Sequence, residues 1–169
     1  MSKFKIVGMM VMIAFTMGMV LGGDAVAAEK GKVTYRQVNY TTTIHTLKVP
    51  DVEGHTNTLI EAKGISFYDK WGAAVTSMVF TMDLIKGIGT FQGYVLTTYP
   101  DGSTATAKFE GKSTAAGATL TGVAVSEGTW TYTKGTGKFQ GIQGGGPFKS
   151  YVIAPGQFYS DNEGEYTLP

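Results

Sequence analysis

Cysteine is absent from this chain of 169 residues, which excludes disulfides, thiol nucleophiles and thiolate metal sites. Charged residues are also scarce, at 16% against the roughly 25% of an average globular protein. Arg36 is the single arginine, and the formal net charge is +1. Because phosphate contacts need clustered lysine and arginine, this composition predicts no nucleic-acid partner.

Long apolar runs are missing as well, except near the amino terminus. Lys3 and Lys5 precede an uncharged run over residues 6–20, and the small residues 25–28 follow it. This run is shorter than the roughly 20 residues that a membrane-spanning helix needs. A basic start, a short apolar run and small residues at the end are typical of a secretory signal peptide, which we predict over residues 1–28.

Cleavage after Ala27 or Ala28 would leave residues 29–169 as one domain with 12 basic and 12 acidic residues. The expected mature protein is secreted or periplasmic and has no integral membrane segment.

Helical spacing of apolar residues is absent after Glu29, whereas alternation and β-branched or aromatic enrichment recur between glycine-rich breaks. The break at Pro100–Gly102 is typical of a tight hairpin turn, because proline fixes one turn position and glycine accepts a positive φ. The pattern predicts eight strands, over residues 33–49, 58–68, 73–86, 90–99, 103–114, 119–133, 138–153 and 157–168.

Eight antiparallel strands in one domain either stack as a sandwich or close as a barrel. Glycines recur inside the predicted strands, and they suit strongly bent strands better than a flat sheet. Closure also removes exposed strand edges. We therefore predict an all-β fold, a single eight-stranded antiparallel barrel, whose interior is either filled by side chains or holds one small ligand.

One eight-residue sequence occurs twice, over residues 86–93 and 134–141, with six of the eight positions identical. Each copy places two glycines before a phenylalanine and a third glycine after it. The glycines suit a tight turn and a close backbone approach, so we predict a repeated structural corner whose Phe91 or Phe139 points inward.

The second copy carries a resemblance. The pattern G-x-G-x-F-x-G-x-x-G is matched at Gly135, Gly137, Phe139, Gly141 and Gly144. It is similar to the glycine signature of the allene oxide cyclase barrel superfamily, which includes the plant dirigent proteins. The stretches 55–68, 100–103 and 163–169 resemble secreted bacterial members of that group whose function is unassigned.

The resemblance implies an eight-stranded barrel with an apolar cavity, no cofactor, and assembly into homodimers or homotrimers. The cyclase site of that superfamily includes a cysteine, which this chain does not have. Cyclase activity is therefore not carried over from the resemblance.

Two carboxylates are the candidate catalytic residues. Glu61 lies in the middle of a predicted strand, and Glu163 alternates with Asp161 and Glu165 on one face of the last strand. A carboxylate buried inside the barrel would have a raised pKa and could act as an acid or base. The opposite face of the last strand is more apolar, which favours the three carboxylates of this strand on the outside.

A loop near the first turn groups His45, Asp51, Glu53 and His55, whose side chains are of metal-ligating types. Their spacing is looser than that of typical zinc ligands, which favours a solvated loop, and we predict no metal.

Aromatic side chains are the better candidates for ligand contact, because they can line an apolar cavity and supply a few hydroxyl groups. The alternative is that these rings fill the core completely. The candidate ligand-binding residues are Tyr35, Tyr40, Phe80, Tyr94, Tyr99, Trp130 and Tyr132.

The function that these features favour is binding of a small hydrophobic molecule inside the barrel, without a cofactor and without catalysis. One alternative is a cofactor-free isomerase or cyclase, which requires an inward carboxylate or tyrosine. A second alternative is a structural or oligomeric protein of the cell envelope, which would expose a large apolar patch.

Overall fold

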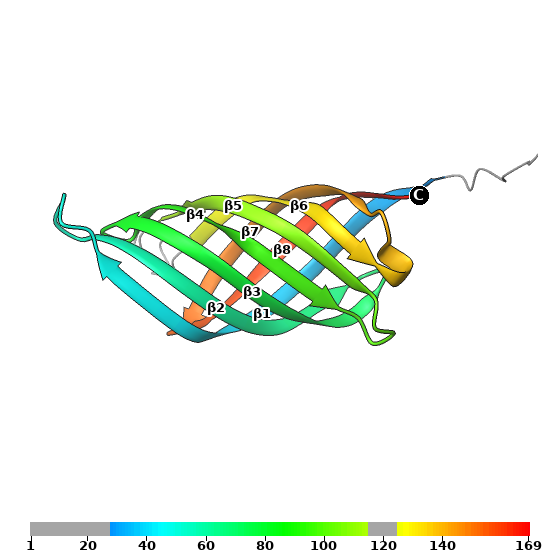
Figure 1. The fold of residues 1–169 in the computed structure, drawn as a ribbon, viewed down its shortest axis with the longest axis horizontal. Helices are drawn as coiled ribbons and strands as arrows, with labels where there is room; N and C mark the ends of the chain where they lie inside the picture. Colours follow the sequence, from blue (N-terminus) through cyan, green and yellow to red (C-terminus); the bar gives the residue numbers. More distant parts are fainter. Residues whose placement is uncertain (1–27, 115–124) are drawn as a thin grey trace, which may run out of the picture.

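The computed structural model describes residues 28–114 and 125–169 as a closed barrel of eight antiparallel strands (Figure 1). Each strand pairs with the next along the chain, and β8 pairs with β1 to close the wall. The predicted fold class is therefore confirmed. The strands are β1 (Glu29–Lys48), β2 (His55–Tyr68), β3 (Gly72–Ile85), β4 (Ile88–Thr98), β5 (Thr104–Ser113), β6 (Val125–Thr136), β7 (Gln143–Ala154) and β8 (Gln157–Leu168).

Alternation along each strand separates an inner from an outer face. In β4, Phe91 and Val95 are buried inside, whereas Gln92, Tyr94 and Leu96 are exposed outside. This period of two is the consequence of side chains that point to opposite faces of a pleated strand. The inner row of one strand lies beside the inner row of the next, so that the barrel has one enclosed interior.

The hairpin predicted at Pro100–Gly102 is present. Gly102 has a φ of +80° and donates its backbone N–H to the carbonyl oxygen of Tyr99 at 2.9 Å. The carboxylate of Asp101 accepts a hydrogen bond from the backbone N–H of Ser103 at 3.0 Å, which holds the turn on its other side. These contacts direct the chain from β4 back into β5.

Glycines on the inner face allow neighbouring strands to approach closely. A Cβ atom at Gly164 would lie 2.8 Å from the ring of Trp130 and closer still to the backbone of Gly145. Any side chain at Gly164 would therefore displace either the indole or the adjacent strand. The prediction that strand glycines serve a bent, closed wall agrees with this position.

The strand predicted over residues 138–153 begins later than expected. Residues Gly137–Phe139 form a single 3₁₀ turn, η1, and β7 starts only at Gln143. Gly137 and Gly141 have φ angles of +59° and +75°, so the chain turns twice here before it becomes extended. In the first copy of the repeat the turn is only Lys86–Gly87, so the two corners differ in shape, although Phe91 and Phe139 are both buried as predicted.

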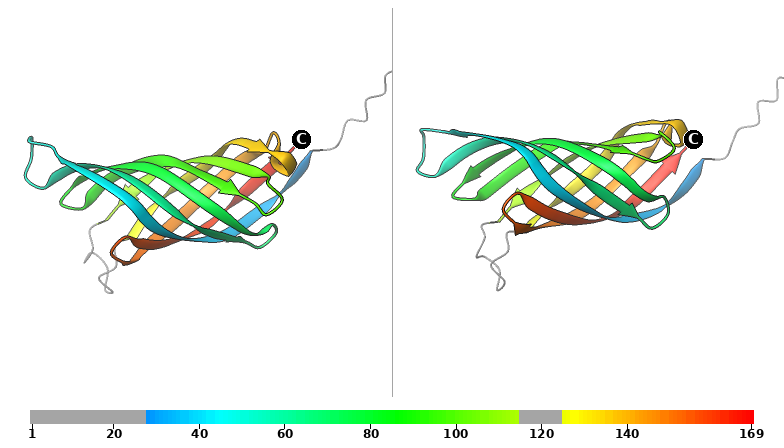
Figure 2. Two further views of the ribbon diagram at one scale, coloured as in Figure 1. Left: turned by 60° about the horizontal axis from the view of Figure 1, so that its bottom comes forward. Right: turned by 90° about the horizontal axis from the view of Figure 1, so that it is seen from below.

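An aromatic plug closes one end of the barrel. Figure 2 shows that η1 and the carboxyl terminus lie at this end. Phe139 of η1 is 1% exposed, and its ring centroid lies 4.4 Å from that of Tyr99 and 4.9 Å from that of Trp71. Trp71 comes from the turn between β2 and β3 and also contacts Tyr68 and Tyr166. We call this end the plugged end.

The opposite end is formed by the β1–β2, β3–β4 and β7–β8 hairpins, and we call it the mouth. There the β1–β2 hairpin projects beyond the rest of the wall, because β1 is the longest strand, with 20 residues (Figure 1).

Two predictions lie outside the described residues, namely the signal peptide, except for Ala28, and the part of a strand predicted over residues 119–124. In the parts of the chain that the structure describes, no helix has the length and apolar character needed to cross a membrane.

Candidate ligand-binding cavity

A cavity of about 170 Å³ occupies the half of the barrel nearer the mouth. Val152 lines it and is 44% exposed, so the cavity reaches the solvent near the β7–β8 hairpin. Most of its wall is apolar. The apolar and aromatic lining residues are Tyr35, Ile60, Met78, Phe80, Met82, Phe91, Val95, Phe109, Trp130, Phe148, Val152 and Phe158.

Polar groups of the cavity gather where β1 meets β8. Tyr35 is paired with Asn162 and Gln37 with Ser160 in the register of these two strands. All four side chains line the cavity, and none of the four residues is more than 9% exposed. We call these four residues the polar wall. The seam that closes the barrel therefore supplies four polar residues of the cavity, and Ser126 of β6 and Ser150 of β7 also line it.

The two carboxamides of the polar wall are held in place by hydrogen bonds from their nitrogen atoms. Nε2 of Gln37 donates to Oδ1 of Asn39 at 2.8 Å and lies 3.1 Å from Sδ of Met78. Nδ2 of Asn162 donates to the hydroxyl oxygen of Ser160 at 3.0 Å and to the carbonyl oxygen of Ser160 at 3.1 Å. These bonds fix the orientation of both side chains against the wall.

Tyr35 is the one titratable residue among the described residues that line the cavity. Burial raises the pKa of its hydroxyl well above the usual value of a tyrosine, and the neighbouring Tyr68 and Tyr132 raise it further. Tyr35 therefore stays a neutral phenol at physiological pH. An interior of this kind can bind and orient a molecule through apolar surface and neutral hydrogen-bonding groups.

Five of the seven predicted ligand-binding residues lie inside the barrel. Tyr35, Phe80 and Trp130 line the cavity, whereas Tyr99 and Tyr132 are buried nearer the plugged end. Of the two alternatives, a cavity between the rings and a completely filled core, the structure shows a cavity in one half of the barrel and packed rings in the other.

Tyr40 and Tyr94 correct that prediction, because both lie on the outer face. Tyr40 is 53% exposed and Tyr94 is 51% exposed. Each occupies the outward phase of its strand, beside the buried Asn39 and Val95. Residue type alone did not distinguish these outward tyrosines from the inward Tyr35.

Glu61 and Glu163 are likewise exposed on the outer face. Glu61 precedes the buried Ala62 in β2, and Glu163 follows the buried Asn162 in β8. Asp161 and Glu165 are exposed too, as the more apolar opposite face of β8 predicted. Neither Glu61 nor Glu163 is the inward carboxylate that the cyclase alternative requires.

The loop residues of metal-ligating type do not form a metal site. Nδ1 of His55 lies 2.6 Å from the carboxylate of Asp51, and Nε2 lies 2.6 Å from that of Asp83. Both ring nitrogens are thus occupied by carboxylates, while His45 and Glu53 are exposed apart from them. Within residues 28–114 and 125–169, no group of three or more suitable side chains could hold a metal ion.

Gln37, Asn162 and the two methionines Met78 and Met82 were missed as cavity residues. A signal for Gln37 existed, because Val33, Tyr35 and Gln37 share one phase of the alternating first strand. A polar residue that continues an inward apolar row is a candidate for a buried hydrogen-bonding group. The methionines gave no comparable signal, since their flexible side chains also suit an ordinary core.

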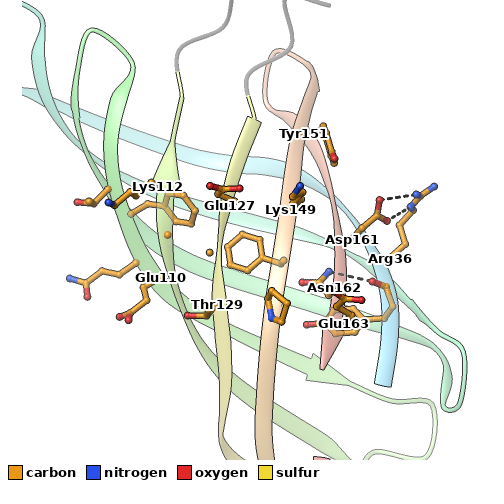
Figure 3. A pocket seen from close by; sticks show the side chains of 18 of the residues that line it. Arg36, Glu110, Lys112, Glu127, Thr129, Lys149, Tyr151, Asp161, Asn162 and Glu163 are labelled. Carbon is orange, nitrogen blue, oxygen red and sulfur yellow. Dashed lines mark hydrogen bonds and ion pairs between the residues drawn. The ribbon is translucent and has the colours of Figure 1, made fainter. Parts of the chain in front are cut away.

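The outer wall carries a ladder of alternating charge that starts beside the polar wall (Figure 3). Arg36 donates two hydrogen bonds to Asp161, at 2.6 and 2.9 Å. Lys149 pairs with Asp161 in register, and Glu127 pairs with Lys149. Arg36 and Asp161 are about half exposed, so solvent screens their ion pair and we expect it to add little to stability.

Comparison with known proteins adds no family to this geometry: no protein-family model and no curated protein matches this chain.

Proposed function

We propose that this protein binds one small, uncharged and mainly apolar molecule inside its barrel. The observation that carries the proposal is the cavity of about 170 Å³, with its apolar lining and its polar wall. An engineered apolar cavity of about 150 Å³ in another protein is large enough for benzene. The expected ligand is therefore compact, on the scale of a single ring with a few substituents.

The lining suits such a ligand energetically. Burial of apolar surface contributes roughly 25 cal/mol per Å², and the rings of Phe80, Phe109 and Phe148 offer fixed surfaces for it. Met78 and Met82 can adapt their side chains to ligands of different shape. Rigid rings together with adaptable methionines favour binding of several related molecules rather than of one molecule alone.

Binding without catalysis is the interpretation that the lining supports best. The cyclase alternative depends on an inward acid or base, and the one titratable group in the described lining is the neutral Tyr35. The expectation of a secreted member of the allene oxide cyclase-like superfamily, in which a signal peptide precedes the barrel, is part of this proposal. The closed eight-stranded fold agrees with that expectation.

The proposal is tested by measuring the melting temperature and the heat of binding of the mature chain against a panel of compact neutral molecules. We expect several members to raise the melting temperature and to bind with one molecule per barrel. Uniform absence of binding across the panel would overturn the proposal and leave the structural alternative.

A pair of variants on β4 locates the site. Val95→Trp places an indole inside the cavity. Leu96→Trp changes the next residue of β4 and places the indole on the outer face of the barrel. We expect Val95→Trp to abolish binding while circular dichroism still shows the barrel, and Leu96→Trp to bind as the unmodified protein does. Equal binding by the two variants would place the ligand outside the cavity.

A further inference from the structure

We infer that the ligand carries a neutral hydrogen-bond donor, an alcohol hydroxyl above all, and places it against the polar wall. This inference rests on the proposed function and specifies the chemistry of its ligand. It follows from the direction in which the carboxamides of Gln37 and Asn162 are held.

The carboxamide nitrogens are used by the protein itself. Gln37 donates to Asn39 and lies within reach of the hydroxyl of Thr76, at 3.4 Å. Asn162 donates to Ser160 and to the carbonyl oxygen of Tyr35, at 3.4 Å. With the nitrogens turned to the wall, the carbonyl oxygens Oε1 of Gln37 and Oδ1 of Asn162 remain for the cavity that both residues line.

These two oxygens are acceptors without a donor. Among the residues that the structure describes, no group donates a hydrogen bond to either oxygen. A molecule that donates a hydrogen bond to such an acceptor gains affinity over one that has no donor. Water can occupy such a position, and a ligand hydroxyl can replace its hydrogen bonds.

Tyr35 completes the arrangement for a hydroxyl. It is paired with Asn162 in register, and in the described part of the barrel its own hydroxyl has no hydrogen-bond partner. A bound alcohol can donate its proton to a carboxamide oxygen and accept a hydrogen bond from Tyr35 on the same oxygen atom. A hydroxyl group therefore uses both capacities of the polar wall.

The same arrangement disfavours two other polar groups. A ketone has no proton to donate, so it leaves both carboxamide oxygens unsatisfied. A carboxylate would lie against those oxygens with no lysine, arginine or histidine among the described lining residues to offset its charge. The structure thus predicts selection of alcohols over ketones and hydrocarbons, and exclusion of carboxylates.

The test uses four ligands with one ring size. Cyclohexanol, cyclohexanone, methylcyclohexane and cyclohexanecarboxylate are titrated into the mature chain, and the dissociation constants are compared by calorimetry. We expect cyclohexanol to bind about tenfold more tightly than cyclohexanone or methylcyclohexane, which corresponds to about one satisfied buried hydrogen bond. We expect no measurable binding of cyclohexanecarboxylate.

Variants assign the preference to the polar wall. Gln37→Met keeps the length of the side chain and removes its acceptor, and Tyr35→Phe removes a single hydroxyl. Each is expected to reduce the ratio of cyclohexanol affinity to methylcyclohexane affinity at least threefold. Tyr40→Phe, which removes a hydroxyl from the outer face, is the matched control and should leave both affinities unchanged.

The outcomes separate this inference from the proposed function. If the hydrocarbon or the ketone binds as tightly as the alcohol, the inference is wrong and the proposed function stands. If none of the neutral ligands binds and a wider panel also fails, both are wrong. A preference for cyclohexanol that survives in both Gln37→Met and Tyr35→Phe would also contradict the inference.

Discussion

His55 joins two carboxylates that come from different parts of the chain, Asp51 in the first turn and Asp83 in β3. Its side chain is 14% exposed, whereas both aspartates are about half exposed. The hydrogen bonds to Asp83 and Asp51 favour the protonated imidazole, and they raise the pKa of His55 above its usual value. The same contact with His55 lowers the pKa of Asp51.

These shifts make the stability of the mouth depend on pH. Protonated His55 stabilises the folded state below the usual pKa of histidine, about 6.5, and this contribution is lost as the pH rises through the raised pKa. Ionised Asp51 contributes above about pH 4 and loses its contribution as the pH falls through its lowered pKa. The cluster is therefore most stabilising between about pH 4 and pH 6.5.

We predict that His55→Gln lowers the melting temperature at pH 5.5 by more than it does at pH 8.5. Thermal melts of the variant and the unmodified protein across this range measure the difference. His45→Gln is the matched control, because His45 is exposed and outside the cluster. An equal effect of His55→Gln at the two pH values would show that the ion pairs contribute nothing.

Glycines on the inner face of a strand set how closely the neighbouring strand can approach. At Gly93 of β4, a Cβ atom would overlap the backbone carbonyl of Val79 and the Cβ atom of Phe80 on β3. Neither of these atoms can move without a shift of β3. Any side chain at this position therefore strains the pairing of β3 with β4, even though the φ angle of Gly93 is ordinary.

We expect Gly93→Ala to destabilise the barrel by about 1–3 kcal/mol, the usual cost of overpacking. Urea denaturation measures this loss. Gln92→Ala, at the neighbouring outward position, should change stability by no more than about 0.5 kcal/mol. A Gly93→Ala variant as stable as Gln92→Ala would mean that β3 and β4 are not held at this spacing.

Most of the strands were predictable from the sequence, because alternating apolar and polar residues indicate a strand and turn-forming residues indicate where it ends. The Pro100–Gly102 hairpin is an example, since both residues have one dominant structural use. The start of β7 was not predictable in the same way, because Gly137 and Gly141 are equally compatible with an extended strand and with the turns that they form.

The site was less predictable than the fold, since it depends on which phase of each strand points inward. Residue type alone predicts Tyr40 and Tyr94 as ligand contacts, yet both lie outside. Gln37 lies inside, although a polar residue ordinarily faces solvent. The position of a strand's inner row depends on pairing across the whole barrel. The sequence of one strand shows which residues share a face, but it does not show which of the two faces points into the barrel.

At the scale of the whole molecule, closure joins the two ends of the chain. The pair of Arg36 and Asp161 spans 125 positions of sequence, and it can form only when β1 and β8 meet. Bringing such distant segments together costs loop entropy before any contact repays it, which makes folds of this class slow to form.

We predict that refolding from urea takes milliseconds to seconds. Trp71 and Trp130, the two tryptophans of the chain, are packed in the aromatic interior, so that stopped-flow fluorescence follows its assembly. Circular dichroism, which follows all strands, should show the same rate. A faster dichroism phase would show that strands form before the interior packs, and refolding within microseconds would contradict the prediction.

The carboxyl terminus lies at the plugged end, where β8 finishes beside the start of β1 (Figure 2). A linker fused after Pro169 would therefore extend away from the mouth. The protein could be tethered to a sensor surface by that linker with the mouth facing the solution, so that dissolved molecules reach this end without passing the attachment point.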